Sequence, residues 1–115
     1  KQLRGASRGF HVAVMKPSRR EWREILPNLP RERKVVMTSA MDHAIGQCFA
    51  AYEAAMAWKQ LGDRMDWCGL CTEHLFEKDA FFERIHSRGG MLQVDRNGTG
   101  LGFDEVLAKA TWKKL

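Results

Sequence analysis

Residues 12–17 read Val-Ala-Val-Met-Lys-Pro, a short apolar run that ends in lysine and proline. A run of this kind is typical of a strand buried in a parallel sheet. Pro17 ends the strand and favours an extended conformation for Lys16. In α/β barrels the carboxyl ends of the strands carry the chemistry, so this lysine is placed where a functional group would stand. From the strand alone, a solvated lysine is the simpler interpretation.

A helix and a second strand are predicted immediately downstream. Ser18 is a suitable helix cap, and apolar side chains follow it at helical spacing as Trp22, Ile25 and Leu26. Two prolines then end this helix. The next apolar run, residues 34–39, predicts a strand that ends in hydroxyl groups.

The strongest helical pattern covers residues 43–61. Several alanines in it allow the helix to pack closely on a sheet. Asp42 is the predicted cap, and Gly62 is predicted to end the helix. The residues that follow the helical period are Ile45, Cys48, Phe49, Tyr52, Ala55, Met56 and Lys59.

The second half of the chain is less regular. Its predicted elements are a strand at 67–72, a turn and helix at 75–85 ended by Gly89 and Gly90, an extended piece at 91–94, a turn at 97–100 and a helix at 103–112. The order β-α-β-α-β favours parallel strands joined by right-handed crossovers. Three such strands neither close a barrel nor cover both faces of a sheet, so we expect the chain to be part of something larger.

Composition restricts the classes of function. Of 115 residues, 44% are hydrophobic and 29% are charged, and no apolar stretch is long enough to span a membrane. The net charge is +5, but glutamates interleave the basic segment 19–34, which favours a solvated face over a nucleic-acid interface. Three cysteines indicate no disulfide framework, so we expect a reducing, cytoplasmic location. Neither nucleic acid nor a membrane is an expected partner.

Two other clusters invite a metal interpretation. Cys68 and Cys71 with His74 nearby resemble half of a zinc site, but structural zinc needs four ligands, so buried thiols are the simpler interpretation. Five carboxylates fall in loops and helix starts, where solvated or capping roles are ordinary: Asp63, Asp66, Glu73, Glu77 and Asp79. His43 is interpreted as a structural residue at the helix start, with a cap or pocket-rim role as the alternative.

Three segments at successive strand ends together resemble the last three barrel strands of the enolase superfamily. They are residues 14–17 (Val-Met-Lys-Pro), 38–46 (Thr-Ser-Ala-Met-Asp-His-Ala-Ile-Gly) and 68–72 (Cys-Gly-Leu-Cys-Thr). Their order and spacing are most similar to the o-succinylbenzoate synthase family of the muconate-lactonising subgroup. The glycine-rich tail at 89–102 is similar to the segment that closes such proteins. The resemblance covers nearly the whole chain.

The resemblance implies an α/β fold, the C-terminal portion of an enolase-superfamily (β/α)-barrel that is incomplete on its own. Residues 1–90 would hold strands six to eight with their helices. Residues 91–115 would form a closing segment that packs on an N-terminal capping domain. Family magnesium ligands lie on strands three to five, so the implied cofactor is Mg²⁺ with ligands outside this chain and none within it. The remainder of the same polypeptide is an expected partner, and the chain alone should be inactive.

The resemblance also implies site residues. Lys16 matches the sixth-strand lysine, whose ammonium group stabilises the negative charge formed when a proton α to a carboxylate is removed. The hydroxyl-bearing end of the seventh strand and a glycine of the eighth, whose backbone approaches closely, recognise the substrate's succinyl carboxylate. The implied substrate-binding residues are Thr38, Ser39, Met41, Gly69 and Leu70.

The implied function is an o-succinylbenzoate synthase-like lyase of menaquinone biosynthesis, which removes a proton α to a carboxylate and then water from a small carboxylate substrate. An N-succinylamino-acid racemase, or another enzyme of the subgroup, shares the lysine positions and is an alternative. A non-enzymatic α/β binding module, supported by the basic segment 19–34, is a second alternative. Residues 68–71 lack the carboxylate of dipeptide epimerases, and Lys16 argues against mandelate-racemase-like members.

Overall fold

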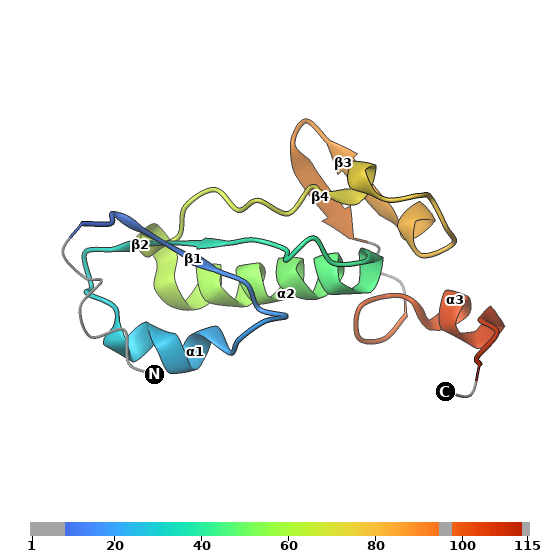
Figure 1. Ribbon diagram of the computed structural model, residues 1–115, viewed down its shortest axis with the longest axis horizontal. Helices are drawn as coiled ribbons and strands as arrows, with labels where there is room; N and C mark the ends of the chain where they lie inside the picture. The colour runs from blue at the N-terminus through green and yellow to red at the C-terminus, as the bar shows by residue number, and fades with distance from the viewer. Residues whose placement is uncertain (1–8, 95–97, 114–115) are drawn as a thin grey trace.

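The computed structural model describes residues 9–94 and 98–113 (Figure 1). In chain order the elements are β1 (Val12–Met15), α1 (Trp22–Ile25), β2 (Lys34–Met37), α2 (Ala44–Leu61), β3 (Ile85–Arg88), β4 (Met91–Val94) and α3 (Asp104–Lys109). Short 3-10 turns lie at Leu26–Asn28, Gly62–Arg64, Glu73–Leu75 and Phe82–Arg84. The fold therefore mixes helices and strands, which agrees with the expected α/β class.

A parallel sheet forms the N-terminal part of the molecule. β1 and β2 pair in parallel, with Met15 opposite Met37. The chain after α2 runs along the other edge of β2 and is held there by two isolated parallel bridges. The Gly69 amide of this third segment donates to the Met37 carbonyl of β2 at 3.0 Å. The order of the three segments in space therefore follows their order in the sequence.

The predicted strand at 67–72 is not a regular strand. Two bridges, Val35 to Met65 and Thr38 to Gly69, replace a continuous ladder. The Trp67 amide donates to the Asp66 carboxylate at 2.8 Å. A side chain that takes a backbone amide in this way competes with strand pairing, and this explains the interruption.

One face of the sheet is covered by helices. Met15, Val35 and Met37 pack with Trp22 of α1 and with Ala54 and Ala57 of α2 in one buried cluster. Alternate side chains of a strand point to opposite faces, so Val12 and Val14 lie on the other face. They are 38% and 59% exposed, and no described element covers them. A parallel sheet is ordinarily buried on both faces, so this open face marks an incomplete core.

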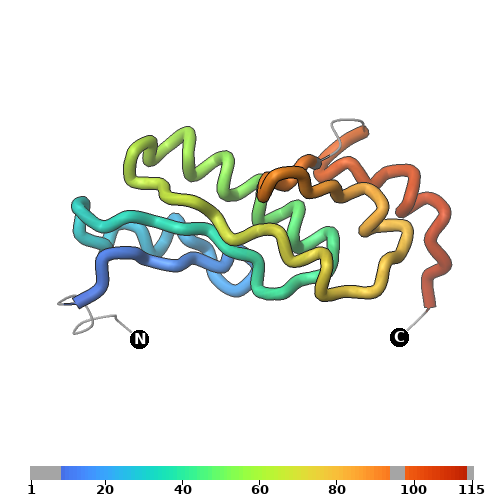
Figure 2. Tube along the Cα trace, turned by 90° about the horizontal axis from the view of Figure 1, so that it is seen from above, coloured from blue at the N-terminus to red at the C-terminus, as the bar shows by residue number. Residues whose placement is uncertain are grey.

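A second buried cluster lies at the opposite end of α2. It contains Ala44, Cys48, Phe82, Ile85 and Phe103. Figure 2 shows the β3–β4 hairpin and α3 gathered at one end of the molecule and the parallel sheet at the other. The radius of gyration is 16.0 Å, whereas a compact chain of this length has about 13 Å. The accessible surface of 8811 Å² likewise exceeds the roughly 6,400 Å² of a compact monomer of this mass.

The first helix is shorter than predicted and begins later. Glu21, not Ser18, is its cap, and the Glu21 side chain accepts from the Arg23 amide. Ser18 instead donates to Asp42 at 2.8 Å. Pro27 converts the continuation into a 3-10 turn. The prediction that Trp22 lies on the buried face of this helix is confirmed, since the residue is 1% exposed.

The bounds of α2 confirm the predicted helix at 43–61, and the predicted packing of its alanines on the sheet is also confirmed. Of the residues that follow the helical period, Cys48 is buried but the large apolar ones are not. The helix ends at Gly62 with φ 51°, as expected, whereas His43 and not Asp42 occupies the cap position. The large apolar residues of the pattern are exposed: Ile45, Phe49, Tyr52 and Met56. The buried face is built from small residues and two polar ones: Ala44, Gln47, Cys48, Ala50, Glu53, Ala54 and Ala57. Alanines permit close approach to the sheet, so packing distance rather than hydrophobic bulk selects this face.

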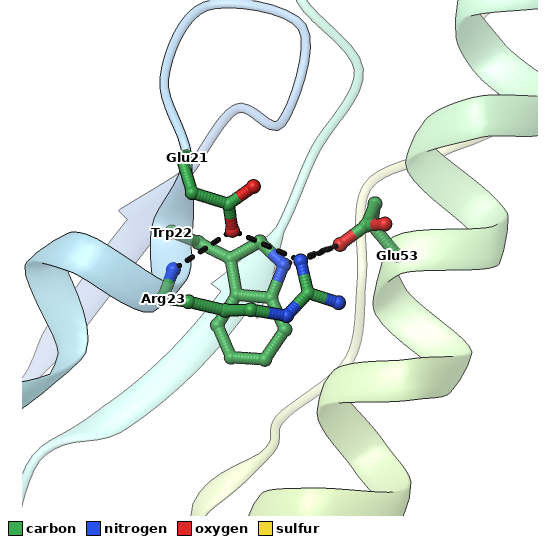
Figure 3. Close-up of polar contacts among 4 residues, drawn as sticks. All are labelled: Glu21, Trp22, Arg23 and Glu53. Carbon is green, nitrogen blue, oxygen red and sulfur yellow. Dashed lines mark hydrogen bonds and ion pairs between the residues drawn. The ribbon is translucent and has the colours of Figure 1, made fainter.

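Glu53 is buried in this face because two donors satisfy it. Its Oε2 accepts from Trp22 Nε1 at 2.5 Å and from Arg23 Nη1 at 2.8 Å (Figure 3). Arg23 also reaches Glu21, so the guanidinium lies between two carboxylates and over the Trp22 ring. A buried charge is tolerated when it is paired and hydrogen-bonded, so Glu53 joins α2 to α1.

The helix predicted at 75–85 does not form, and the two glycines predicted to end it have another role. The helix is replaced by 3-10 turns and β3. The Asp79 carboxylate caps the second turn by accepting from the Phe81 and Phe82 amides at 2.9 and 3.0 Å. The turn ends at Ile85, because this residue is extended and pairs with Val94 in the hairpin. Gly89 and Gly90 form the turn of the β3–β4 hairpin, with φ of 57° and 76°. The extended piece at 91–94 is confirmed as β4.

The final helix is also shorter than predicted. α3 covers Asp104–Lys109, because Ala110 leaves the helical conformation with ψ 135°. Trp112 lies beyond it and is 74% exposed, so the tryptophan contributes no buried contact that would extend the helix. Of the predicted turn at 97–100, Asn97 lies outside the described residues, and Gly98 and Gly100 have positive φ.

Candidate functional site

Lys16, Thr38 and Gly69 lie at one level, meaning that they stand side by side at the carboxyl ends of the three parallel segments. The Thr38 amide donates to the Met15 carbonyl at 2.9 Å, and continuing the β1–β2 register by one residue places Lys16 beside Thr38. On its other side Thr38 bridges Gly69. Because the neighbouring Met15 and Met37 face the helices, alternation puts Lys16 and Thr38 on the open face.

Gly69 lies on the same face as the Thr38 side chain. A Cβ atom added to Gly69 would stand 3.3 Å from Thr38 Cγ2. The Thr38 hydroxyl oxygen is buried and has no hydrogen-bond partner within the part of the chain that the structure describes. Buried hydroxyls are normally paired, so this oxygen is an unsatisfied hydrogen-bonding group at the strand ends.

Ser39 and Leu70, two other predicted site residues, lie on the helix side of the sheet. Ser39 is 6% exposed, and its hydroxyl lies 3.0 Å from the Thr72 hydroxyl. Leu70 is half-buried and packs against the cluster beneath α1 and α2. The structure therefore separates the two predicted hydroxyls, with Thr38 on the open face and Ser39 beneath it.

Met41, the last predicted site residue, lies in the loop between β2 and α2. It is 62% exposed and has φ 57°, a left-handed conformation that is uncommon for a non-glycine residue. Met41 is therefore exposed in this loop and not in a buried contact.

Asp42 has a role beyond the helix capping that the sequence predicts. Its Oδ2 accepts from Ser18 Oγ at 2.8 Å and from the Ala40 amide at 2.9 Å. The acid thereby joins the turn after β1 to the loop after β2, which are the two segments that carry Lys16 and Thr38. The residue in the sequence that could have indicated this role is Gly46, four positions after Asp42. A Cβ atom added to Gly46 would lie 2.4 Å from the Asp42 Cβ, so the glycine is needed to make room for the acid.

His43 lies at the N-terminus of α2 and faces the second cluster. Its Nε2 lies 2.8 Å from Asp79 Oδ2, and its ring meets the Phe81 and Phe82 rings edge-on at 5.4 and 4.8 Å. Burial alone would raise the pKa of Asp79, but hydrogen bonds from the Phe82 amide, His43 and the Phe81 amide hold that pKa below its usual value. These contacts agree with the structural interpretation of His43.

The cysteines are neutral thiols in this environment. Burial raises the pKa of Cys48 to about 11 and also raises the pKa values of Cys68 and Cys71. Cys68 and Cys71 donate to the Asp66 and Gly90 carbonyls at 3.5 and 3.6 Å. Within residues 9–94 and 98–113, no three His, Cys, Asp or Glu side chains gather as a group that could hold a metal ion.

Comparison with known proteins gives one informative similarity. The chain is 32% identical over 111 residues to the o-succinylbenzoate synthase of Bdellovibrio bacteriovorus. The matched stretch is 96% of this chain but 33% of that enzyme, so the chain spans about a third of the length of the curated relative it matches. No family model matches the sequence. Among the described residues, no helix has the length and apolar character needed to cross a bilayer.

Proposed function

We propose that this chain is the C-terminal part of an o-succinylbenzoate synthase-like lyase in which Lys16 is a catalytic residue. The observation that carries the proposal is the shared level of Lys16, Thr38 and Gly69 at the carboxyl ends of three neighbouring parallel segments. Its support is the 32% identity to one third of such an enzyme. In α/β barrels this edge of the sheet is where substrates meet their catalytic groups.

Lys16 would stabilise negative charge on the substrate. Its ammonium group is a compact point charge, and it stands at the open face rather than among the helices. When a base removes the proton α to the substrate carboxylate, negative charge develops on the carboxylate oxygens. A cation already in place near those oxygens lowers the energy of that state without reorganisation.

Thr38 and Gly69 would recognise the substrate's second carboxylate. The buried, unpaired Thr38 hydroxyl supports a donor role, and the missing side chain of Gly69 leaves its backbone approachable. Met41 stays a proposed substrate contact. Ser39 and Leu70, which face the helices, are better supported as positioning residues that hold the strand ends.

Mg²⁺ would supply further positive charge to the substrate in an enzyme of this class. The residues of this chain do not fit as its ligands, because no suitable group of donors gathers in the described ranges. We therefore assign the metal ligands to the remainder of the polypeptide.

The remainder of the polypeptide is the proposed partner of the open face. Val12 and Val14 need cover, and the excess surface of the chain supports packing against further protein. We propose that residues 1–90 form strands six to eight of a barrel with their helices. Residues 91–115 would close the barrel against a capping domain. The chain alone would then be inactive.

The test uses the complete protein that carries this segment. We expect it to dehydrate the o-succinylbenzoate synthase substrate, and we expect Lys16→Ala to lower kcat by at least about 100-fold while the fold persists. Lys109→Ala, which changes an exposed lysine on α3, is the matched control. A Lys16→Ala enzyme with near-normal kcat would remove the proposed role.

A parallel assay distinguishes the alternatives within the subgroup. Racemisation of N-succinylamino acids without dehydration would identify the racemase instead. Absence of both activities in the folded, magnesium-loaded protein would overturn the enzymatic proposal and favour a binding module.

A further inference from the structure

We propose that Asp42 is a positioning residue that fixes the Lys16 turn to the loop that follows Thr38. The catalytic consequence of this inference rests on the proposed function of Lys16, but the tether itself does not. Its geometry is a single carboxylate oxygen, Asp42 Oδ2, that accepts from Ser18 Oγ at 2.8 Å and from the Ala40 amide at 2.9 Å.

The first of these donors belongs to the turn that begins at Lys16. The Lys16 carbonyl accepts from the amides of Arg19 and Arg20 at 2.9 and 3.2 Å, so residues 16–20 form one closed turn. Ser18 lies within this turn. The hydrogen bond from Ser18 to Asp42 therefore restrains the backbone that carries the lysine, across 24 positions of sequence.

Asp42 is itself held in place by α2. Its backbone carbonyl accepts from Gln47 Nε2 at 3.1 Å, and Gln47 is fully buried in the first turns of the helix. The positive φ of Met41 turns the chain just before Asp42. At Gly46 an added Cβ atom would stand 2.4 Å from the Asp42 Cβ, so the glycine leaves the space that the acid occupies.

These contacts matter because Lys16 is a long, exposed side chain at the end of a short strand. A charged group stabilises a transition state only while it is held near the reacting atoms, and a displacement of about 1 Å can cost about 100-fold in rate. Asp42 contributes by limiting the motion of the Lys16 turn relative to Thr38. Removing it is expected to lower kcat more than it raises KM.

Both donors meet the same oxygen, and this gives the proposal a sharp test. Asparagine at position 42 retains one acceptor oxygen but not the charge, whereas alanine retains neither. Asp42→Asn should therefore preserve the tether that Asp42→Ala removes. Ser18→Ala removes only the link to the lysine turn. Asp63→Ala is the matched control, because Asp63 is an exposed acid just beyond the other end of α2.

The experiment measures hydrogen exchange of the Arg19 and Arg20 amides, together with kcat and KM, in the complete protein. Loss of a hydrogen bond to a charged group should raise exchange at these amides by about tenfold in Asp42→Ala and Ser18→Ala. Asp42→Asn and Asp63→Ala should stay near the wild type. In an active enzyme, kcat should fall about 10- to 100-fold in Asp42→Ala and recover in Asp42→Asn.

Several results would overturn the inference. Unchanged exchange in both Asp42→Ala and Ser18→Ala would show that no tether exists. Faster exchange with an unaltered kcat would show that the tether positions nothing. If Asp42→Ala fails to fold, Ser18→Ala alone decides whether the tether exists. Loss of the Ser18 hydroxyl leaves the hydrogen bond between Asp42 and the Ala40 amide in place. If the wild type is inactive, the proposed function fails while the exchange measurement still decides the tether.

Discussion

Gly69 stands close beside Thr38, since a Cβ atom added to the glycine would lie 3.3 Å from Thr38 Cγ2, a tight contact that a small shift of the threonine would have to relieve. The two residues face each other where the third parallel segment meets β2. Of the contacts at the strand ends, this one joins the two groups proposed to recognise a carboxylate. It therefore gives the most direct test of the substrate side of the site.

We expect Gly69→Ala in the complete protein to raise KM for the carboxylate substrate by about tenfold, with a smaller effect on kcat. The new methyl group crowds Thr38 and keeps the substrate away from the backbone, and overpacking of this kind costs about 1 kcal/mol of stability. Steady-state kinetics and thermal unfolding provide the measurements. Gly9→Ala is the control, because nothing lies within 4 Å of its added Cβ. A KM equal to that of the control would argue against the close approach.

The level shared by Lys16, Thr38 and Gly69 could be predicted from the sequence because it follows from a local rule. Apolar runs predict parallel strands, and parallel strands that share a sheet end at one edge. The same rule could not show that Thr38 and Ser39 point to opposite faces of the sheet in the order observed. Which of two neighbouring residues faces the helices depends on the register of the strand, and the rule does not give that register. Nor could it find the Ser18–Asp42 contact, which joins loops far apart in sequence.

The packing of the α2 alanines on the sheet could be predicted, whereas the exposure of the large apolar residues of this helix could not. A count of large apolar residues selects Ile45, Phe49, Tyr52 and Met56, which are exposed. The sheet instead takes the alanine face, because small side chains let the helix approach closely. Glu53 could be placed in that face only with knowledge of Trp22 and Arg23 on α1.

Removing Glu53 should destabilise the fold more than removing an exposed acid. We expect Glu53→Ala to lower the free energy of unfolding by about 2–3 kcal/mol, because the Trp22 indole N–H and the Arg23 guanidinium lose their shared acceptor (Figure 3). Glu53→Gln keeps an acceptor oxygen and should cost less. Chemical denaturation measures both, with Glu24→Ala on the exposed side of α1 as the control. Equal losses for Glu53→Ala and Glu24→Ala would contradict the proposed link.

The hydrogen bonds that Asp79 accepts from the Phe82 amide, His43 and the Phe81 amide should make the second cluster sensitive to acid. The folded pKa of Asp79 lies below its ordinary value of 3.8, so this carboxylate stabilises the fold above that value and loses its contribution as the pH falls through the lower, folded pKa. Unfolding measured from pH 6 to pH 2 should therefore show a steeper loss of stability in the wild type than in Asp79→Asn. Asp63→Asn, at an exposed acid beyond α2, should keep the wild-type slope. Parallel slopes for the wild type and Asp79→Asn would contradict a pKa of Asp79 lowered by these hydrogen bonds.

The three thiols should react with an alkylating agent in a fixed order. Burial raises the pKa of Cys48 to about 11, so at pH 8 only about one molecule in a thousand carries the thiolate, which is the reactive form. Cys68 and Cys71 are half-buried and have smaller pKa increases, so iodoacetamide should label them first. Peptide mass spectrometry during labelling gives the order, and labelling in denaturant supplies the control in which all three react alike. Early labelling of Cys48 in the native protein would mean that the packing of α2 against Phe82 and Ile85 opens readily, because only such opening exposes this thiol.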